Sequence, residues 1–328
     1  MSEQREGQRD ASDYREGGAG DVPAENERQW QAWALQPRTL VGPRAVDLTT
    51  TVHGLELALP VLAAPSAWHG LWHPEAEAET ARGVVASGCG LVLSHGSTLP
   101  PEEVATAPYL QQLYLSEDRE LVLPFVERAR AAGAVALVLT VDQLPVPRQQ
   151  AFRLAASEVP APRWSAYDTT LAGSVPARGF GPEDVAWLAT ATSLPVVVKG
   201  VLHPDDAVAA VDAGAAGVVV SNHGGRQLAG SITTAEVLPE VVAAVAGRVP
   251  VHVDSGIRDA TDVVRALALG ADSVWLGRPV LRALEAGGAD AVAALLRELR
   301  DDLAGLLALL GVDTPADLHP GLVRRRVA

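Results

Sequence analysis

The sequence contains very little cysteine and no long apolar segment. Cys89 is the only cysteine among 328 residues, so a disulfide within the chain is excluded. The first 21 residues are polar and charged, without the apolar core of a signal peptide. Even the apolar run 303–312 is shorter than the ~20 residues that a membrane helix needs. We therefore expect a cytoplasmic protein that does not contact a membrane.

Positive charge is also scarce. The chain has 26 lysine and arginine residues against 40 aspartate and glutamate residues, which gives a formal net charge of -14 and a pI near 5.0. A surface that binds nucleic acid needs a basic excess, so a nucleic acid partner is excluded. We predict a small-molecule substrate instead, and no metal site.

Strand-like and helical segments alternate along most of the chain. Hydrophobic residues make up 48% of the sequence, and eight apolar runs have the length of a strand. Helical patterns separate most of these runs, which implies right-handed βαβ crossovers and a parallel sheet. An open doubly wound sheet would usually show Gly-x-Gly-x-x-Gly after its first strand, and that fingerprint is absent. We therefore predict an α/β fold, a closed (β/α)8 TIM barrel. The predicted strands are 59–64, 90–94, 112–115, 135–141, 195–199, 217–221, 249–254 and 273–277, and the predicted helices are 75–86, 119–132, 182–192, 204–213, 234–246 and 258–269.

The chain divides into an N-terminal extension, 1–50, and a barrel domain, 51–328. The extension contains one predicted helix, 24–35. It ends before Pro37, because proline disfavours helical geometry in the residue that precedes it.

The barrel domain has one long loop, which follows the fourth predicted strand. Residues 143–181 are rich in proline and have no helical period, as is typical of a lid or binding loop. The last helix, 278–310, is predicted in two pieces. We assign no chemistry to the basic tail 323–328.

A cluster of polar residues and glycines ends the sixth predicted strand, within 218–228. His223 can exchange a proton near neutral pH, and Arg226 is a fixed cation with a planar donor fork. Gly224 and Gly225 allow the backbone to approach a ligand closely. We interpret this turn as a general base beside an anion clamp. A surface turn with a capping histidine is the alternative.

Polar residues also follow most of the other predicted strands. Taken singly, each has a simpler explanation: Asp142 could cap a helix, Lys199 could be a solvated strand end, and Gln112 could bond only to backbone. In a barrel, however, all of these strand ends face one mouth, where active sites lie. The recurrence at seven of the eight strands therefore favours an active site. The residues are Ser94, Gln112, Tyr114, Thr140, Asp142, Lys199, Ser221, His223, Asp254, Gly277 and Arg278.

Two segments indicate a phosphate site. Asp-Ser-Gly-Ile-Arg at 254–258 follows the seventh strand, and Leu-Gly-Arg-Pro at 276–279 follows the eighth. Barrels commonly bind phosphate there, with backbone N–H groups and helix N-termini, and Arg258 and Arg278 add charge. Lys199 would place a fixed positive charge in the mouth, which suits a cofactor that becomes anionic when reduced. A phosphate together with an electron acceptor indicates FMN.

With these motifs the chain resembles the FMN-dependent α-hydroxy-acid oxidases and dehydrogenases, which include glycolate oxidase, lactate oxidase, mandelate dehydrogenase and hydroxymandelate oxidase. The resemblance covers residues 13 to 278, and the motifs agree in order and spacing. The most specific motif is Ser-Asn-His-Gly-Gly-Arg-Gln-Leu at 221–228. The others are Gln-Leu-Tyr at 112–114, Leu-Thr-Val-Asp at 139–142, Val-Lys-Gly at 198–200, Asp-Ser-Gly-Ile-Arg at 254–258 and Gly-Arg-Pro-Val at 277–280.

The resemblance implies that His223 removes the α-proton or the hydroxyl proton while the α-carbon hydrogen passes to flavin N5. Asp142 would orient the imidazole, Arg226 would bind the substrate carboxylate, and Tyr114 would hydrogen-bond the reacting oxygen. Lys199 would stabilise reduced flavin at N1 and O2. The resemblance also implies a homotetramer or larger assembly, with O2 or another electron acceptor. Further cofactor contacts are implied for Ala64, Pro65, Ser66, Ala67, Ser94, Gln112, Thr140, Asp254, Gly256, Arg258, Gly277 and Arg278.

The carboxylate site departs from the family's pattern. The family usually carries two arginines after the fourth strand, and the second pairs with Arg226 on the carboxylate. Counting from Asp142 places Arg148 and Gln149 on those positions, so the second arginine is absent. Arg148 could substitute if the loop is one residue shorter. Otherwise one arginine holds the carboxylate, or the substrate is not a free acid.

Two further positions bear on the substrate. Tyr14 matches the family's Tyr-x-x-Gly near the N-terminus, although about two residues are missing after the motif. Gly96 stands where members with small substrates carry a bulky aromatic residue, which predicts a wider pocket. Our main hypothesis is oxidation of a 2-hydroxy acid with an aryl or bulky side chain to the 2-oxo acid. The alternatives are an FMN enzyme acting on a peptide-derived or amide-like α-carbon, and a non-catalytic flavin-binding protein.

Overall fold

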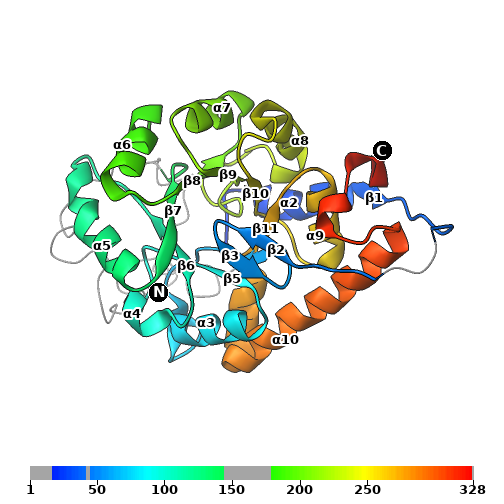
Figure 1. Cartoon of the computed structure of the whole chain (residues 1–328), viewed down its shortest axis with the longest axis horizontal. Coiled ribbons are helices and arrows are strands. Elements are labelled where there is room, and N and C mark those ends of the chain that lie inside the picture. The colour runs from blue at the N-terminus through cyan, green and yellow to red at the C-terminus, as the bar shows by residue number, and fades with distance from the viewer. Residues whose placement is uncertain (1–16, 42–44, 144–178, 327–328) are drawn as a thin grey trace, which may run out of the picture.

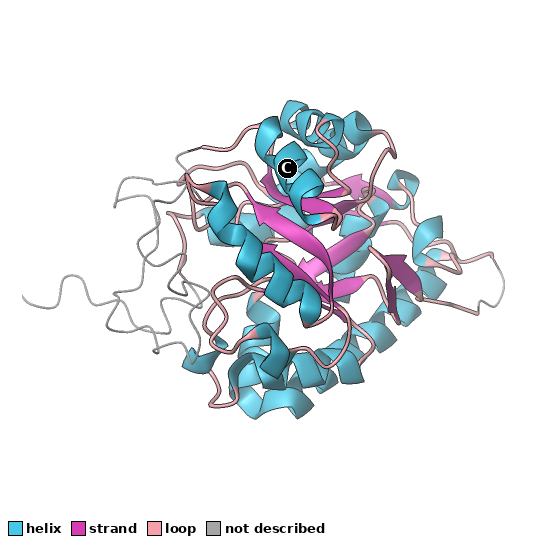
Figure 2. Ribbon diagram, turned by 60° about the vertical axis from the view of Figure 1, so that its left-hand side comes forward, coloured by secondary structure: helices cyan, strands magenta, loops and turns pink. Residues whose placement is uncertain are grey.

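The computed structural model describes residues 17–41, 45–143 and 179–326, and they form a closed barrel of eight parallel strands. The strands occupy the centre of the molecule and the helices surround them (Figures 1 and 2). The predicted (β/α)8 fold is therefore confirmed. In barrel order from β4, the strands are β4 (Val61–Ala63), β5 (Gly90–Leu93), β6 (Tyr109–Leu113), β7 (Ala134–Thr140), β8 (Val196–Val201), β9 (Gly217–Val220), β10 (Val251–Val253) and β11 (Ser273–Leu276).

Helices follow the strands as the alternation predicts. Capping groups fix several of their first turns: in α8, the Thr233 backbone N–H and hydroxyl both donate to the Glu236 carboxylate, at 3.2 and 2.7 Å. The last helix is interrupted at Gly287 and Gly288, which confirms its two pieces. No helix in the described ranges is long and apolar enough to cross a membrane. The helices are α3 (Ala76–Ala86), α4 (Pro101–Val104), α5 (Leu123–Ala131, after the 3-10 turn Arg119–Val122), α6 (Pro182–Thr192), α7 (Pro204–Asp212), α8 (Thr234–Val245), α9 (Ala260–Ala268) and α10 (Arg278–Leu310).

The hydrophobic core has two layers, because successive side chains of a strand point to opposite faces. In β9, Val218 and Val220 pack outward against the helices, whereas Val219 packs inside the barrel. In β4, Val61 packs outward and Leu62 inward in the same way. Strands buried on both faces are continuous apolar runs, which is why the sequence reveals them so clearly.

The N-terminal helix is shorter than predicted. The helix α2 (Val22–Gln31) ends at Gln31, and the following residues form β1 (Trp33–Leu35). This strand pairs antiparallel with β12 (Val323–Arg325), next to the C-terminal end of the chain (Figure 1). The predicted extension of the helix to residue 35 is therefore wrong. Its strand partner lies near the other end of the chain, and local periodicity cannot reveal such a pairing.

A hairpin that the sequence analysis missed inserts apolar side chains into the barrel. It consists of β2 (Thr50–Val52) and β3 (Leu55–Leu57), and its Val52, Leu55 and Leu57 belong to the inner layer. His53 in its turn lies beside Gly217, the first residue of β9, which places the hairpin at the amino ends of the strands. A Cβ at Gly217 would lie 2.9 Å from the His53 ring, so a larger residue there would displace this ring.

A chain of buried polar groups rises from this hairpin through the barrel interior. The Nε2 atoms of His53 and His252 are 2.9 Å apart, so one ring donates a hydrogen bond to the other. The other ring nitrogen of His252 lies 2.8 Å from the Ser273 hydroxyl, which also accepts from the Trp275 indole at 3.2 Å. Since Trp275 lines the pocket described below, these groups connect the floor of the barrel to its mouth.

We expect acid to destabilise the fold through this histidine pair. Burial lowers the pKa of His53 to about 4 and lowers the pKa of His252 well below its usual value. In the unfolded chain both titrate near ~6.5. The unfolded state then binds more protons, and the free energy of unfolding falls as the pH drops from ~6.5 towards ~4.

Urea unfolding at several pH values in this window measures the effect. The double variant His53→Gln/His252→Gln should show a shallower pH dependence than the wild type. Replacing the exposed His319 by glutamine is the matched control and should leave the slope unchanged. A wild-type slope in the double variant would contradict the assignment.

Candidate active site

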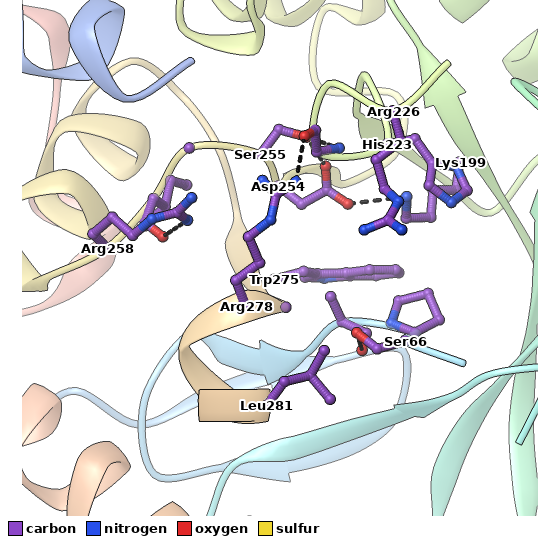
Figure 3. A pocket seen from close by; sticks show the side chains of 16 residues that line it. Ser66, Lys199, His223, Arg226, Asp254, Ser255, Arg258, Trp275, Arg278 and Leu281 are labelled. Atoms are coloured by element: carbon purple, nitrogen blue, oxygen red, sulfur yellow. Dashed lines mark hydrogen bonds and ion pairs between the residues drawn. The ribbon is translucent and has the colours of Figure 1, made fainter. Parts of the chain in front are cut away.

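A pocket lies at the carboxyl ends of β4, β8, β9, β10 and β11 (Figure 3). His223, Arg226 and Lys199 lie at one end of it, and Arg258 lies at the other. Most of the residues predicted for the cofactor line this pocket, although they come from four loops and from β8, far apart in the sequence. The predicted residues that line it are Ala64, Pro65, Ser66, Lys199, His223, Arg226, Asp254, Gly256, Arg258, Gly277 and Arg278.

The loop after β9 presents His223 in an unusual backbone conformation. His223, Gly224 and Gly225 have φ values of 57°, 67° and 78°, all in the left-handed region. The His223 Nδ1 atom lies 2.9 Å from Oδ1 of Asp142, which follows β7. When Nδ1 carries the proton and donates it to this carboxylate, the Nε2 lone pair is available to accept a proton. The geometry is that of a histidine base oriented by an aspartate.

Asp142 is held in a tight and largely buried position. Burial raises its pKa, but attraction to His223, the hydrogen bond between them and the Lys199 charge outweigh that effect, so the Asp142 pKa is lowered. The backbone of Gly200 packs directly against it: a Cβ there would lie 2.7 Å from the Asp142 Cβ. Oδ2 of Asp142 is buried and has no hydrogen-bond partner within the described ranges. The carboxylate therefore stays ionised and serves His223.

Lys199, at the end of β8, is buried rather than solvated. Only 3% of the residue is exposed, and its Nζ lies 3.0 Å from Oδ2 of Asp254 and 2.8 Å from the Ser221 hydroxyl. The Ser255 hydroxyl donates to the other oxygen of Asp254 at 2.7 Å. Burying an ammonium group is unfavourable unless it is paired. The Asp254 carboxylate and the Ser221 hydroxyl therefore stabilise the Lys199 ammonium group in the buried pocket.

Gln112, Thr140 and Ser94 form a hydrogen-bonded row across three neighbouring strands. The Gln112 amide donates to the Thr140 hydroxyl at 3.1 Å, and its oxygen accepts from the Ser94 hydroxyl at 3.4 Å and from the His95 N–H at 2.9 Å. Gln112 thus bonds to side chains as well as backbone. All three residues are buried and present polar atoms at the strand ends.

The surroundings of Gly96 differ from the predicted open space. A Cβ at Gly96 would lie 3.0 Å from the Ala67 Cβ and 3.9 Å from Nε1 of Trp68. The backbone N–H of Trp68 donates to the Gly96 carbonyl at 3.0 Å. On the neighbouring strand, the Tyr114 N–H donates to Nδ1 of His95 at 3.0 Å. An indole from the loop after β4 therefore adjoins Gly96, the position for which the sequence predicted a wider pocket.

Comparison with known proteins identifies this arrangement. Residues 3–325 match the FMN-dependent dehydrogenase family. The chain belongs to this family. It is 41% identical to the L-lactate oxidase of a Nostoc species, over 94% of this chain and 92% of that protein. It is 40% identical to the glycolate oxidase of Spinacia oleracea, over 91% and 87%.

Solved structures of relatives share the whole fold. A mandelate oxidase variant in which leucine replaces an arginine, with 2-hydroxy-phenylacetamide, has a TM-score of 0.87 at 36% identity, covering 96% of this chain and 94% of that one. Mandelate oxidase with (S)-4-hydroxymandelic acid has a TM-score of 0.83 at 35% identity, covering 97% and 95%. As an FMN-dependent dehydrogenase, the protein is an enzyme that uses FMN and oxidises a CH–OH group. The family, the enzyme class and the cofactor inferred from the motifs are thus confirmed.

The pocket of this FMN-dependent dehydrogenase fits a phosphate at the end opposite His223. Gly256 has a φ of 85°, and a Cβ there would lie 2.6 Å from the Asn26 backbone, so this position in the loop requires glycine. Arg258 pairs with Glu27 at 2.7 Å, and Arg278 donates to the Gly224 carbonyl at 3.0 Å. Both cations line the pocket, and their positive charges suit a bound phosphate.

The sequence motifs did not predict every residue of the pocket. Three predicted residues, Tyr14, Arg148 and Gln149, lie outside the described residues. Ser255 stands in the predicted phosphate motif and could have been found there. Trp275 is an apolar strand residue with no signal of its own, and Leu281 is one among many in a helix. The pocket-lining residues that were missed are Ser255, Ile257, Trp275 and Leu281, whereas Gly224 lines the pocket as its predicted close approach to a ligand requires.

Proposed function

We propose that this enzyme oxidises a 2-hydroxy acid with an aryl or bulky side chain to the 2-oxo acid, with His223 as the base. The observation that carries this proposal is the 2.9 Å contact between His223 Nδ1 and Asp142 Oδ1 in a loop that lines the cofactor pocket. A proton removed by Nε2 leaves the imidazolium paired with an ionised carboxylate, which stabilises it. Bound FMN supplies the acceptor for the two electrons of the substrate.

Neighbouring residues are assigned to substrate binding and to cofactor binding. Arg226 lies on the same loop as the base, so a carboxylate bound to its guanidinium holds the α-carbon close to His223. Tyr114 follows β6 at the same mouth and is assigned to the reacting oxygen. Lys199 supplies the buried positive charge beside the flavin. Ser94, Gln112, Thr140 and Asp254 are assigned to the flavin and ribityl groups, and Ala64, Pro65, Ser66, Ala67, Gly256, Arg258, Gly277 and Arg278 to the backbone cradle and phosphate.

The preference for an aryl side chain rests on the region around Gly96. Nε1 of Trp68 lies 3.9 Å from the position that a Cβ would take at Gly96, and we assign this indole as the aromatic surface for an aryl side chain. Aromatic groups that pack edge-to-face or offset gain ~0.5–1.5 kcal/mol beyond the burial of apolar area. Mandelate oxidase structures with an aryl acid are among the similar folds. Relatives named for lactate and glycolate show that the family also accepts small acids.

We expect mandelate-like acids to reduce the flavin faster than lactate, and lactate faster than glycolate. A carboxylate held by Arg226 without a second arginine loses hydrogen bonds worth ~1.5–3 kcal/mol each, and small acids have little apolar area to offset the loss. Anaerobic bleaching of the flavin absorbance with each acid measures the order. A faster reduction by glycolate than by mandelate would refute the pocket argument.

The variant Gln149→Arg should raise activity on lactate and glycolate if the second clamp is absent in the wild type.

A second candidate substrate is an α-hydroxy amide or the end of a modified peptide. Gln149 in place of an arginine favours it, since an amide side chain can pair with a neutral amide. A mandelate oxidase variant that lacks an arginine has been solved with 2-hydroxy-phenylacetamide. Including this amide in the same assay separates the two candidates. If no compound bleaches the flavin, the non-catalytic flavin-binding hypothesis is favoured.

We also propose O2 as the electron acceptor, a homotetramer or larger assembly, and a cytoplasmic location. The relatives named oxidases support the first proposal. Release of hydrogen peroxide during aerobic turnover tests it, and sedimentation of the purified enzyme tests the assembly.

A further inference from the structure

Two buried asparagines from distant parts of the chain pair reciprocally below the His223 loop. The Asn26 amide donates to Oδ1 of Asn222 at 2.9 Å, and the Asn222 amide donates to Oδ1 of Asn26 at 2.7 Å. Asn26 is 0% exposed and Asn222 4% exposed. Asn26 belongs to α2, whereas Asn222 immediately precedes the proposed base. The pair therefore joins the N-terminal extension directly to the catalytic loop.

The orientation of this pair is determined by further bonds of Asn222. Its Oδ1 also accepts from the Gly225 N–H at 3.0 Å, and its Nδ2 also donates to the Ile232 carbonyl at 3.2 Å. The Asn222 amide therefore cannot exchange its oxygen and nitrogen without losing both bonds. One N–H and one lone pair of the Asn222 amide remain, and the Asn26 amide, in the opposite orientation, pairs with both.

The loop needs such a constraint because its backbone is strained. A non-glycine residue in the left-handed region costs ~1–3 kcal/mol, and His223 occupies that region with a φ of 57°. Strained conformations persist only where the surroundings over-determine them. Asn222 closes the turn that contains His223, because its side-chain Oδ1 and its backbone carbonyl both accept from the Gly225 N–H, at 3.0 and 2.9 Å.

The same helix contacts the other half of the pocket. The Trp30 indole donates to the Ser255 carbonyl at 2.8 Å, and the Asn26 backbone leaves no room for a side chain at Gly256. The Ala19 N–H, just before α2, donates to the Gly225 carbonyl at 2.6 Å. The helix thus fixes the base loop through Asn26 and the phosphate loop through Trp30.

We infer that Asn26 is a positioning residue for the reaction: through Asn222 it holds the His223 loop in its left-handed conformation and so aims the imidazole at the substrate. This inference rests on the proposed role of His223 as the base. A displacement of a reacting group by ~1 Å can cost ~10²-fold in rate, so loss of the pair should slow the chemical step. Although Arg226 lies on the same loop, substrate binding should change less than the rate, because the long Arg226 side chain can still reach a carboxylate after a small displacement of the loop.

The test compares Asn26→Ala, Asn222→Ala and the double variant with Gln29→Ala. Gln29 lies on the same helix but bonds only to Glu25 and Arg325 among the described residues, so it controls for damage to α2. Single-turnover reduction of FMN-saturated enzyme gives the rate constant and the substrate Kd separately. Hydrogen exchange of a peptide covering 221–228 reports the loop without any turnover.

We expect each single variant to reduce its flavin at least ~10-fold more slowly, with less than ~3-fold change in Kd and faster exchange in 221–228. The double variant should match the singles, because both remove one interaction. Asn26→Asp, which keeps the shape of the side chain but places an oxygen against Asn222 Oδ1, should behave similarly if the alanine variants do not fold. Unchanged reduction rates with faster exchange would overturn the inference. If no 2-hydroxy acid or amide reduces the flavin of the wild-type enzyme, the proposed function is overturned instead. Hydrogen exchange of the peptide 221–228 would still show whether the Asn26–Asn222 pair holds the loop.

Discussion

Replacing His223 by asparagine should leave FMN bound and lower the rate constant of flavin reduction by ~10²-fold to 10⁴-fold, the usual contribution of a general base. Asparagine is the suitable replacement because it tolerates the left-handed region that His223 occupies, with a φ of 57°. Alanine tolerates that region less well, so it would disturb the loop as well as remove the base. Anaerobic stopped-flow absorbance with a mandelate-like acid measures the rate constant.

A histidine elsewhere in the barrel provides the matched control. His203 precedes α7 and is exposed, and its side chain accepts only from the Asp205 N–H among the hydrogen bonds of the described residues. His203→Asn should reduce its flavin at the wild-type rate. If His223→Asn retains wild-type reduction while the flavin is fully bound, the base lies elsewhere. If the variant loses FMN, the substitution has disturbed the loop as well as removed the imidazole. The rate constant is then determined from the fraction of enzyme that retains flavin.

Replacing Lys199 by methionine should lower the free energy of unfolding by ~3–5 kcal/mol and weaken FMN binding. The substitution leaves the Asp254 carboxylate buried without its cation, and breaking a buried ion pair from one side carries a cost of this size. The side chains of Lys199 and Asp254 are only 4% and 9% exposed, so water cannot replace the lost partner. Urea unfolding of the FMN-free protein measures the stability, and flavin fluorescence measures the binding.

The double variant Lys199→Met/Asp254→Asn separates stability from chemistry. It removes both charges, so most of the lost stability should return. The reduction rate should remain low, because the positive charge beside the flavin is still absent. The exposed pair between Arg248 and Asp212 is the control, and Arg248→Met should cost less than ~1 kcal/mol. Equal stability of Lys199→Met and wild type would show that the pair does not stabilise the fold.

The barrel and most of its site were predictable because their signals are local. Each strand is buried on both faces and is therefore a continuous apolar run, and parallel strands bring their carboxyl ends to one mouth. Polar residues that directly follow such runs, such as Lys199, His223 and Asp254, must then share that mouth. The structure brings these three to one pocket. Their chemical types and their order along the chain also carried the resemblance to the family.

Pairings between distant segments were decided only by the tertiary structure. The strand β1 replaces the end of a predicted helix because β12 offers it a partner, and the hairpin of β2 and β3 is short and has no turn signal strong enough to predict. From the sequence alone, Lys199 fits a solvated strand end as well as a buried cation. The structure decides for the buried cation, because Asp254 and Ser221 surround the Lys199 side chain.

The sequence by itself determined the fold class and the cofactor and predicted the reacting groups, because these inferences depend on local periodicity and on residue type. Only the tertiary structure determined how those groups are held. Asn26 and Asn222 are ordinary polar residues in the sequence, and their reciprocal pairing depends on α2 packing against the loop after β9. Likewise, Trp68 adjoins Gly96 only because the loops after β4 and β5 are neighbours in the closed barrel. Such contacts depend on distances in space, for which the order of residues along the chain contains no local signal.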